Sequence, residues 1–225
     1  MKRIFLPFVL LMLMARAAFS CEVALVMALD VSRSVDRDEY KLMRDGIASA
    51  FLDDEVRQLI EWMPGGIMVT VTQWGGEGQQ RQAVPWQRVR DKAGIVRFVD
   101  AFTSQSRGFW MADTAVSEAL IHADGMFRGA PSKCRRHVID VSGDGIANAG
   151  AQAAPIAQAI GYEGTTINGL VITGANPDPV AYFEQNVISG PFAFVEVANS
   201  YVDYPRAMKR KLLRELTPAV ATLAD

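Results

Sequence analysis

The sequence is poor in cysteine and histidine, with two of each in 225 residues. His122 is predicted on a helix and His137 at the start of a strand, and neither position indicates a catalytic site. A large charge of one sign is also missing, because the formal net charge is −2. We interpret the one short basic cluster, Lys209-Arg210-Lys211, as the solvated face of a helix. These features give no indication of a nucleic-acid partner.

The sequence also lacks an apolar run of the roughly 20 residues that a membrane span needs. The apolar core at 4–15 is shorter, follows Lys2 and Arg3, and is followed by the small-x-small cleavage site Ala18-Phe19-Ser20. Residues 1–20 are therefore predicted to be a signal peptide. An uncleaved anchor and a lipidated Cys21 are the alternatives that stay open. The predicted location is the periplasm or the outside of the cell, with no membrane span in the mature chain.

No internal repeat, low-complexity segment or linker divides the rest of the chain. Half of the residues are hydrophobic, which fits a substantial core. We therefore predict one domain over residues 21–225.

Alternating strand and helix patterns predict an α/β fold. Buried strands are expected at 23–29, 67–74, 136–142, 165–173 and 192–198, with an antiparallel return at 80–86 after a glycine-rich turn. Helices are expected at 35–52, 54–62, 91–102, 114–127, 151–160, 179–186 and 202–216. Asp36 and Glu39 form a capping-box pattern at the first helix. We predict a doubly wound, mostly parallel sheet with one antiparallel edge strand and helices on both faces.

The first buried strand, 23–29, leads directly into a group of oxygen-bearing side chains. Asp30, Ser32 and Ser34 stand at alternate positions just past its carboxyl end. Ligands bind at such positions in open α/β sheets. One carboxylate and two hydroxyls suit a hard cation such as Mg²⁺ better than Zn²⁺. The alternative is that Asp30 or Ser32 only caps the next helix.

Two further loops offer oxygen donors at what should be the same edge of the sheet. Thr114 stands at a predicted helix start, and the turn Ser142-Gly143-Asp144-Gly145 follows the strand at 136–142. Together the three loops bring three hydroxyls and two carboxylates to one edge.

These motifs resemble the von Willebrand factor type A (vWA) domain and its metal-ion-dependent adhesion site (MIDAS). The Asp-x-Ser-x-Ser motif matches Asp30, Ser32 and Ser34, the single threonine matches Thr114, and the later aspartate matches Asp144. The resemblance covers residues 22–217. The stretches 138–145, 166–170 and 185–191 are similar to one exported bacterial branch of this superfamily, which is catalogued as a domain of unknown function.

The resemblance implies a Mg²⁺ or Mn²⁺ site. In the family the two serines and the threonine contact the metal, and the aspartates act largely through water. One coordination position is left for an Asp or Glu carboxylate of a protein partner. The sequence departs from the pattern at Arg33, where a small residue is usual, and at Asp113, where glycine commonly stands. Arg33 could obstruct the site or help to hold an acidic ligand.

Two pairs of residues outside this motif allow alternative interpretations. Phe109 and Trp110, in the loop before Thr114, either belong to a partner surface or pack on the edge of the sheet. Cys21 and Cys134 precede two strands by similar distances, so parallel neighbouring strands would let them form a disulfide. The alternative for the cysteines is two unrelated thiols.

Three functions compete on this sequence. The leading hypothesis is an exported, metal-dependent protein-interaction module. The second is a Mg²⁺-dependent hydrolase of the phosphohydrolase kind, although Ser32 stands where such enzymes need a second aspartate. Ser142 also lacks the Gly-x-Ser-x-Gly setting of a hydrolase nucleophile, so no catalytic constellation is recognised. The third is a degenerate vWA domain with a purely structural role.

Overall fold

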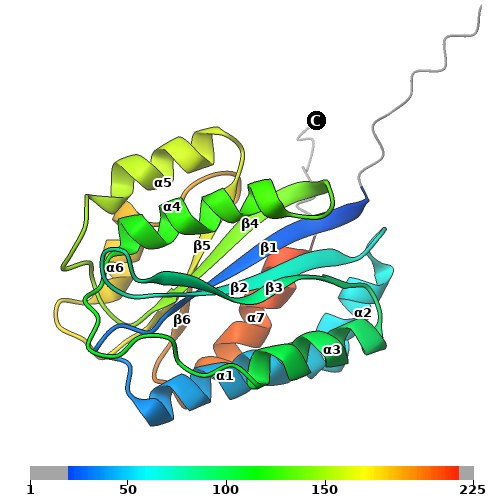
Figure 1. The fold of residues 1–225 in the computed structure, drawn as a ribbon, viewed down its shortest axis with the longest axis horizontal. Coiled ribbons are helices and arrows are strands. Elements are labelled where there is room, and N and C mark those ends of the chain that lie inside the picture. The colour runs from blue at the N-terminus through cyan, green and yellow to red at the C-terminus, as the bar shows by residue number, and fades with distance from the viewer. Residues whose placement is uncertain (1–19, 218–225) are drawn as a thin grey trace, which may run out of the picture.

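The computed structural model describes residues 20–217, so the predicted signal peptide, except for Ser20, lies outside the described residues. One sheet of six strands has the order β3-β2-β1-β4-β5-β6 (Figure 1). Its strands are β1 (Cys21–Asp30), β2 (Ile67–Trp74), β3 (Gln80–Val89), β4 (Cys134–Gly143), β5 (Thr166–Ile172) and β6 (Val195–Ala198). All neighbouring pairs are parallel except β2 and β3, so the predicted fold class with one antiparallel edge strand is confirmed.

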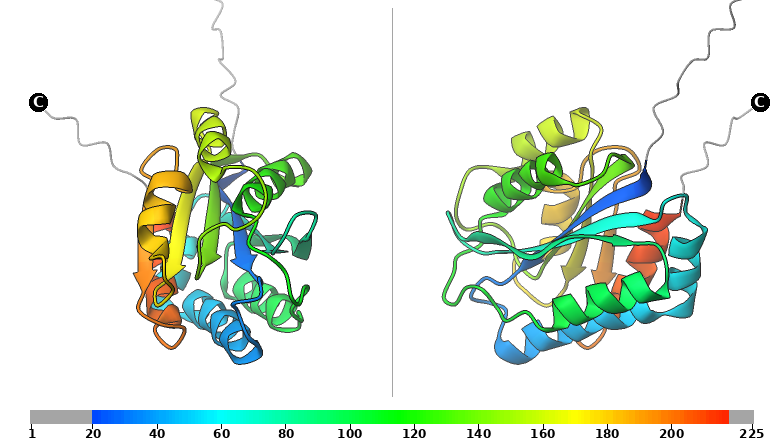
Figure 2. Two further views of the ribbon diagram at one scale, coloured as in Figure 1. Left: turned by 90° about the vertical axis from the view of Figure 1, so that its left-hand side faces the viewer. Right: turned by 45° about the vertical axis from the view of Figure 1, so that its right-hand side comes forward.

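Helices cover both faces of the sheet, as Figures 1 and 2 show. One layer contains α1 (Arg37–Leu52), α2 (Asp54–Trp62), α3 (Lys92–Thr103) and α7 (Tyr204–Leu216). The other contains α4 (Val116–Met126), α5 (Ala153–Tyr162) and α6 (Pro179–Asn186). Leu25 and Met27 of β1 face the first layer, and Val26 and Ala28 face the second. This alternation explains why the whole strand is apolar.

The ends of several elements differ from the predicted ones for local reasons. The expected capping box is present, with Asp36 and Glu39 bonded reciprocally at the start of α1. The last strand is shorter than predicted, because Phe192 has a φ of 59° in the left-handed region and interrupts the extended chain. None of the helices within residues 20–217 is long and apolar enough to cross a bilayer.

The two cysteines form the predicted disulfide. Cys21 and Cys134 are register partners of the parallel strands β1 and β4, with Cα atoms 4.5 Å apart. The bond closes a loop of 113 residues, which corresponds to about 4–5 kcal/mol on the chain-entropy account. It joins the two central strands at their amino ends, far from the carboxyl ends where ligands bind in such sheets.

The interpretation of the basic cluster as a solvated face was wrong for Lys211. Lys211 is fully buried, because it shares the inner face of α7 with Met208 and Glu215 at helical spacing. Its ammonium lies 2.7 Å from Asp140 Oδ1 and also contacts Glu215. Asp140, in the middle of β4, is therefore an ion-pair partner in the interior.

Candidate metal centre

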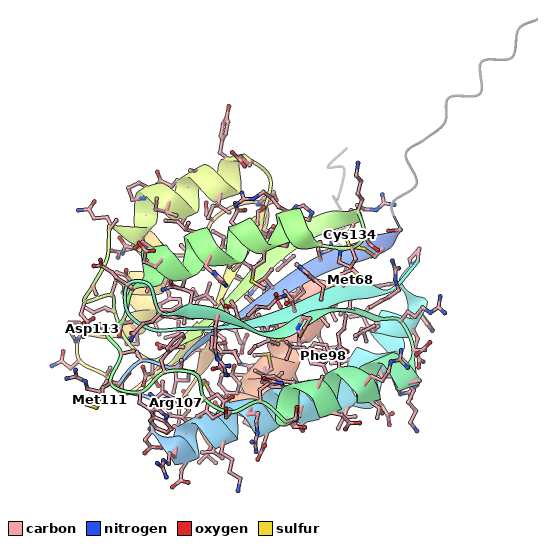
Figure 3. The ribbon with its side chains drawn as sticks, viewed as in Figure 1. Met68, Phe98, Arg107, Met111, Asp113 and Cys134 are labelled. Carbon is pink, nitrogen blue, oxygen red and sulfur yellow. A yellow bond between two sulfur atoms is a disulfide. The ribbon has the colours of Figure 1, made fainter. Side chains whose placement is uncertain are left out.

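The predicted ligands lie at the point where the chain leaves the sheet in opposite directions. Strands β1 and β4 are central neighbours, and β1 is followed by α1 on one face while β4 is followed by α5 on the other. A crevice outside the strand ends is expected at such a switch point. Figure 3 shows Arg107, Met111 and Asp113 at this end of the molecule and Cys134 at the opposite end.

Asp30 is the last residue of β1 and is fully buried. Its Oδ1 accepts a hydrogen bond of 2.7 Å from the backbone N–H of Ser32, whereas its Oδ2 is buried without a hydrogen-bond partner among the described residues. Burial, followed by the negative charge of Asp144, raises the pKa of Asp30 to about 7. An unpartnered carboxylate oxygen in the interior is costly, and a bound cation would compensate for it.

Gly143, at the end of β4, leaves space beside this oxygen. A Cβ atom at this position would lie 3.2 Å from Asp30 Oδ2 and 3.2 Å from the Phe183 ring. Any side chain here would therefore crowd the carboxylate. The absence of a side chain at Gly143 therefore keeps room beside Asp30 Oδ2.

Two serines and Asp144 form one hydrogen-bonded chain beside Asp30. The hydroxyls of Ser32 and Ser34 are 3.2 Å apart, and the Ser34 hydroxyl donates to Asp144 Oδ1 at 2.7 Å. Tyr201, in the loop before α7, donates its hydroxyl to Asp144 Oδ2 at 2.8 Å. Burial and the neighbouring carboxylate raise the pKa of Tyr201, so it remains a donor. The structure thus joins residues that are 110 positions apart in sequence.

Thr114 is buried in the loop before α4, and backbone bonds attach this loop to the loops after β1 and β4. The backbone N–H of Arg33 donates to the carbonyl of Ala112 at 2.8 Å. The backbone N–H of Thr114 donates to Asn148 Oδ1 at 2.8 Å, and the carbonyl of Thr114 accepts from the backbone N–H of Asn148 at 3.0 Å. These bonds keep Thr114 out of α4, which begins two residues later with Ala115 as its N-cap. The predicted helix start at Thr114 was therefore wrong.

Arg107 organises the loop after β1, although the sequence analysis did not identify it. Its buried guanidinium donates to the carbonyls of Val31 at 2.9 Å and Ser32 at 2.8 Å, and also to that of Val35. Its Nε donates to the carbonyl of Phe109 at 2.8 Å. Burial lowers the pKa of Arg107, and the charge of Asp30 opposes this. A lone arginine in a loop carries no local signal of this role.

Of the two aromatic residues before Thr114, one packs on the protein and the other is exposed. Phe109 is half-buried and packs against the core. Trp110 is 51% exposed, with the guanidinium of Arg107 4.2 Å and that of Arg37 5.1 Å from its ring centroid. Met111 is 70% exposed, and its φ of 59° is uncommon for a residue with a side chain.

The donor set at this edge is composed of hydroxyl and carboxylate oxygens. Within residues 20–217 no group of three or more His, Cys, Asp or Glu side chains could hold a metal ion. A metal here would have to rely on Ser32, Ser34 and Thr114 in addition to the two aspartates. Such a set is typical of sites for hard cations and not for soft ones.

Solved structures support the fold but differ strongly in sequence. Proximal thread matrix protein 1 (PTMP1) from the mussel byssus is 18% identical with a TM-score of 0.65, over 88% of this chain and 49% of that one. A PTMP1 structure described as having a zinc occupied MIDAS motif is 13% identical with a TM-score of 0.63, over 87% and 46%. A von Willebrand factor type A protein from Catenulispora acidiphila is 17% identical with a TM-score of 0.57, over 87% and 42%.

The chain thus spans less than half of each of these structures, and their likeness establishes a vWA-like fold. No curated protein matches it. Residues 20–220 match the family described as "Protein of unknown function (DUF1194)". The chain therefore belongs to this family, and its residues 20–217 have a vWA-like fold.

Proposed function

We propose that this protein is an exported binding module that uses Mg²⁺ or Mn²⁺ to hold a carboxylate of a protein partner. The observation that carries the proposal is the unpartnered, buried Oδ2 of Asp30 beside the hydroxyls of Ser32 and Ser34. A bound cation would compensate for this unpartnered carboxylate oxygen. Thr114 and Asp144, which lie in loops bonded to the same region, complete the proposed site.

The donor chemistry supports a role in anion capture. A bound Mg²⁺ or Mn²⁺ would supply positive charge at the edge of the sheet. Only two of the five proposed residues are carboxylates, so such an ion would keep much of its charge and its affinity for an external carboxylate. The hydroxyls of Ser32, Ser34 and Thr114 would orient the ion. PTMP1, with its zinc-occupied MIDAS, is a precedent for a divalent metal on this fold.

The residues that depart from the vWA pattern are compatible with an open site. The side chains of Arg33 and Asp113 are both exposed. Arg33 is held near the site by its backbone bond to Ala112. Its positive charge would favour an acidic partner by steering.

Export is supported by the disulfide, since such bonds persist in oxidising compartments. The predicted signal peptide agrees with this location. The phosphohydrolase alternative has less support, because Ser32 stands where such enzymes need a second aspartate. Ser142, the other hydroxyl considered as a hydrolase nucleophile, is buried and hydrogen-bonded to the Tyr204 hydroxyl at 3.0 Å. We therefore favour binding over catalysis.

The proposal is tested with the metal alone and then with a minimal carboxylate. We expect Mn²⁺ to raise the melting temperature of the purified protein relative to EDTA, and Asp30→Ala to remove that increase. Glutarate should then displace water from protein-bound Mn²⁺, which lowers the water proton relaxation enhancement.

Asp38→Ala is the matched control, because Asp38 lies in the first turn of α1 and its side chain is exposed. This variant should respond to Mn²⁺ like the wild type. If neither Mn²⁺ nor Mg²⁺ changes the melting temperature at millimolar concentration, the metal-dependent function is wrong and a structural role becomes the better hypothesis.

A further inference from the structure

A cavity of about 990 Å³ lies at the amino ends of the strands, whereas the proposed metal site lies at their carboxyl ends. It is bounded by the amino ends of β4 and β5, the segment before β6 and the last turn of α7. Its volume is in the range of small-molecule sites. The proposed metal-binding function makes no use of it.

The walls of the cavity combine apolar surface with positive charge. The apolar lining residues are Val138, Pro191, Phe192, Phe194 and Leu213. Three arginines, Arg135, Arg136 and Arg214, also line it, against the two acids Glu22 and Glu215. Glu22 is already paired with Arg135 at 3.1 Å. The chemistry of this lining therefore favours a ligand that is apolar over most of its length and anionic at one end.

Arg214 is the cation best placed to receive that anion. Its guanidinium carbon lies 3.8 Å from the centroid of the Phe194 ring. The residue is exposed, and it makes no ion pair or hydrogen bond with any residue of 20–217. Stacking on an aromatic ring fixes the plane of a guanidinium and leaves its N–H edge available for a carboxylate. Arg136, in contrast, donates to the carbonyl of Glu215 at 2.9 Å.

Phe192 provides an exposed aromatic surface at the same cavity. Its side chain is 73% exposed, and its φ of 59° places the backbone in a region that few residues other than glycine adopt. Such conformations occur where function or surrounding structure requires them. Phe194, two residues later, is buried and forms the platform under Arg214.

From this geometry we infer that the cavity binds a small amphipathic carboxylate. The carboxylate pairs with Arg214, and the apolar body lies against Phe192, Phe194 and Leu213. Binding is independent of the proposed metal site, because the two sites lie at opposite ends of the strands.

Decanoate is the probe, with decanol as its uncharged counterpart, and both are titrated calorimetrically in EDTA. We expect saturable binding of decanoate and at least about tenfold weaker binding of decanol, because a charge-assisted bond to guanidinium is lost. Arg214→Gln should weaken decanoate binding by about tenfold while leaving the melting temperature unchanged. Arg97→Gln, at an exposed position of α3, is the matched control and should bind like the wild type.

Phe192→Ser is the second variant, and it should weaken decanoate and decanol to a similar degree because it removes apolar contact. The inference is overturned if no saturable binding occurs at millimolar decanoate. It is also overturned if decanol binds as well as decanoate, or if Arg214→Gln behaves like Arg97→Gln. Binding that needs Mn²⁺ and disappears in Asp30→Ala would assign the probe to the metal site and would equally refute the cavity.

Discussion

Asp30 and Asp140 are two fully buried carboxylates on neighbouring strands, and the fold gives them opposite surroundings. Asp140, in the middle of β4, has the ammonium of Lys211 2.7 Å from its Oδ1. Asp30, at the end of β1, makes no ion pair within residues 20–217, and the Oδ2 atoms of both aspartates are buried there without a hydrogen-bond partner. The chain supplies a cation to Asp140 in the interior, and we propose that the cation for Asp30 comes from solvent.

Each site has a buried cation nearby, but the two cations do different things. Lys211 contacts both Asp140 and Glu215, and Asn168 donates to Glu215 Oε1 at 2.8 Å. Arg107 donates instead to backbone carbonyls around the loop after β1. Lys211 therefore neutralises acids, whereas Arg107 shapes a loop and leaves Asp30 without an ion pair.

The largest effect is expected from removing the interior cation. Lys211→Met would leave Asp140 and Glu215 as buried acids without a counterion, and should lower the free energy of unfolding by about 3–5 kcal/mol. Urea denaturation monitored by circular dichroism measures this. Lys209→Met is the matched control on the same helix, since Lys209 makes partly exposed ion pairs with Asp53 and Glu55.

The control should lose less than about 1 kcal/mol. Equal losses in the two variants would show that the interior ion pairs contribute no more than surface ones. The assignment of Asp140 as a structural acid would then fail.

Much of the fold could be predicted because its signals are local. The apolar run that became β1, the glycine-rich turn before β3 and the capping box of α1 each depend on neighbouring residues. Element ends shifted where a distant contact intervened, as at Thr114, whose N–H is bonded to Asn148. Lys211 was misplaced because a run of three basic residues resembles a solvated face, although helical spacing puts only its third member inside.

The candidate site was predictable only as far as its motif residues. Asp30, Ser32, Ser34 and Asp144 lie within one hydrogen-bonded group, and Thr114 lies in an adjoining loop. The residues that position them were not predictable. Tyr201, Asn148 and Arg107 each act through a contact 34 or more residues away in sequence, and none belongs to a local pattern. Whether the motif residues bind metal stays a prediction.

A second prediction concerns Arg107, the buried cation beside the loop after β1. Arg107→Met removes the donors to three buried carbonyls of the loop after β1, and should cost roughly 2–4 kcal/mol of unfolding free energy. Because the loop positions Ser32 and Ser34, Mn²⁺ affinity should fall as well, by about tenfold or more. Arg97→Met, on exposed surface of α3, serves as the control. Unchanged Mn²⁺ affinity in a folded Arg107→Met protein would mean that Arg107 does not position the ligands.

A third prediction concerns Glu215 and the pH dependence of the free energy of unfolding. Burial raises the pKa of Glu215 from 4.5 to about 7, and Lys211, Asp140, Arg136 and Tyr204 are charged or titratable groups that interact with it. The folded state then binds the proton of the Glu215 carboxyl group more tightly than the unfolded chain does. The stabilisation is complete below pH 4.5 and is lost as pH rises towards 7.

Between about pH 5 and 8, the unfolding free energy of the wild type should fall by roughly 1–3 kcal/mol relative to Glu215→Gln. Urea denaturation of both proteins across this range measures the difference. Parallel pH profiles would mean that Glu215 is already ionised at acid pH and that Lys211 neutralises both acids fully.

The smallest effect is expected at Asp30, and its sign separates the two carboxylates. In EDTA at pH 8, Asp30→Asn removes a buried charge without an ion-pair partner, keeps an oxygen for the Ser32 N–H, and should raise the unfolding free energy by about 1 kcal/mol. Asp140→Asn should lower it, because Lys211 loses a partner. With Mn²⁺ at about 100 times its dissociation constant, the wild type gains about 2.7 kcal/mol and Asp30→Asn does not, so their order reverses. If Asp30→Asn destabilises the metal-free protein as much as Asp140→Asn does, Asp30 is a structural acid like its neighbour and the edge of the sheet is not prepared for a cation.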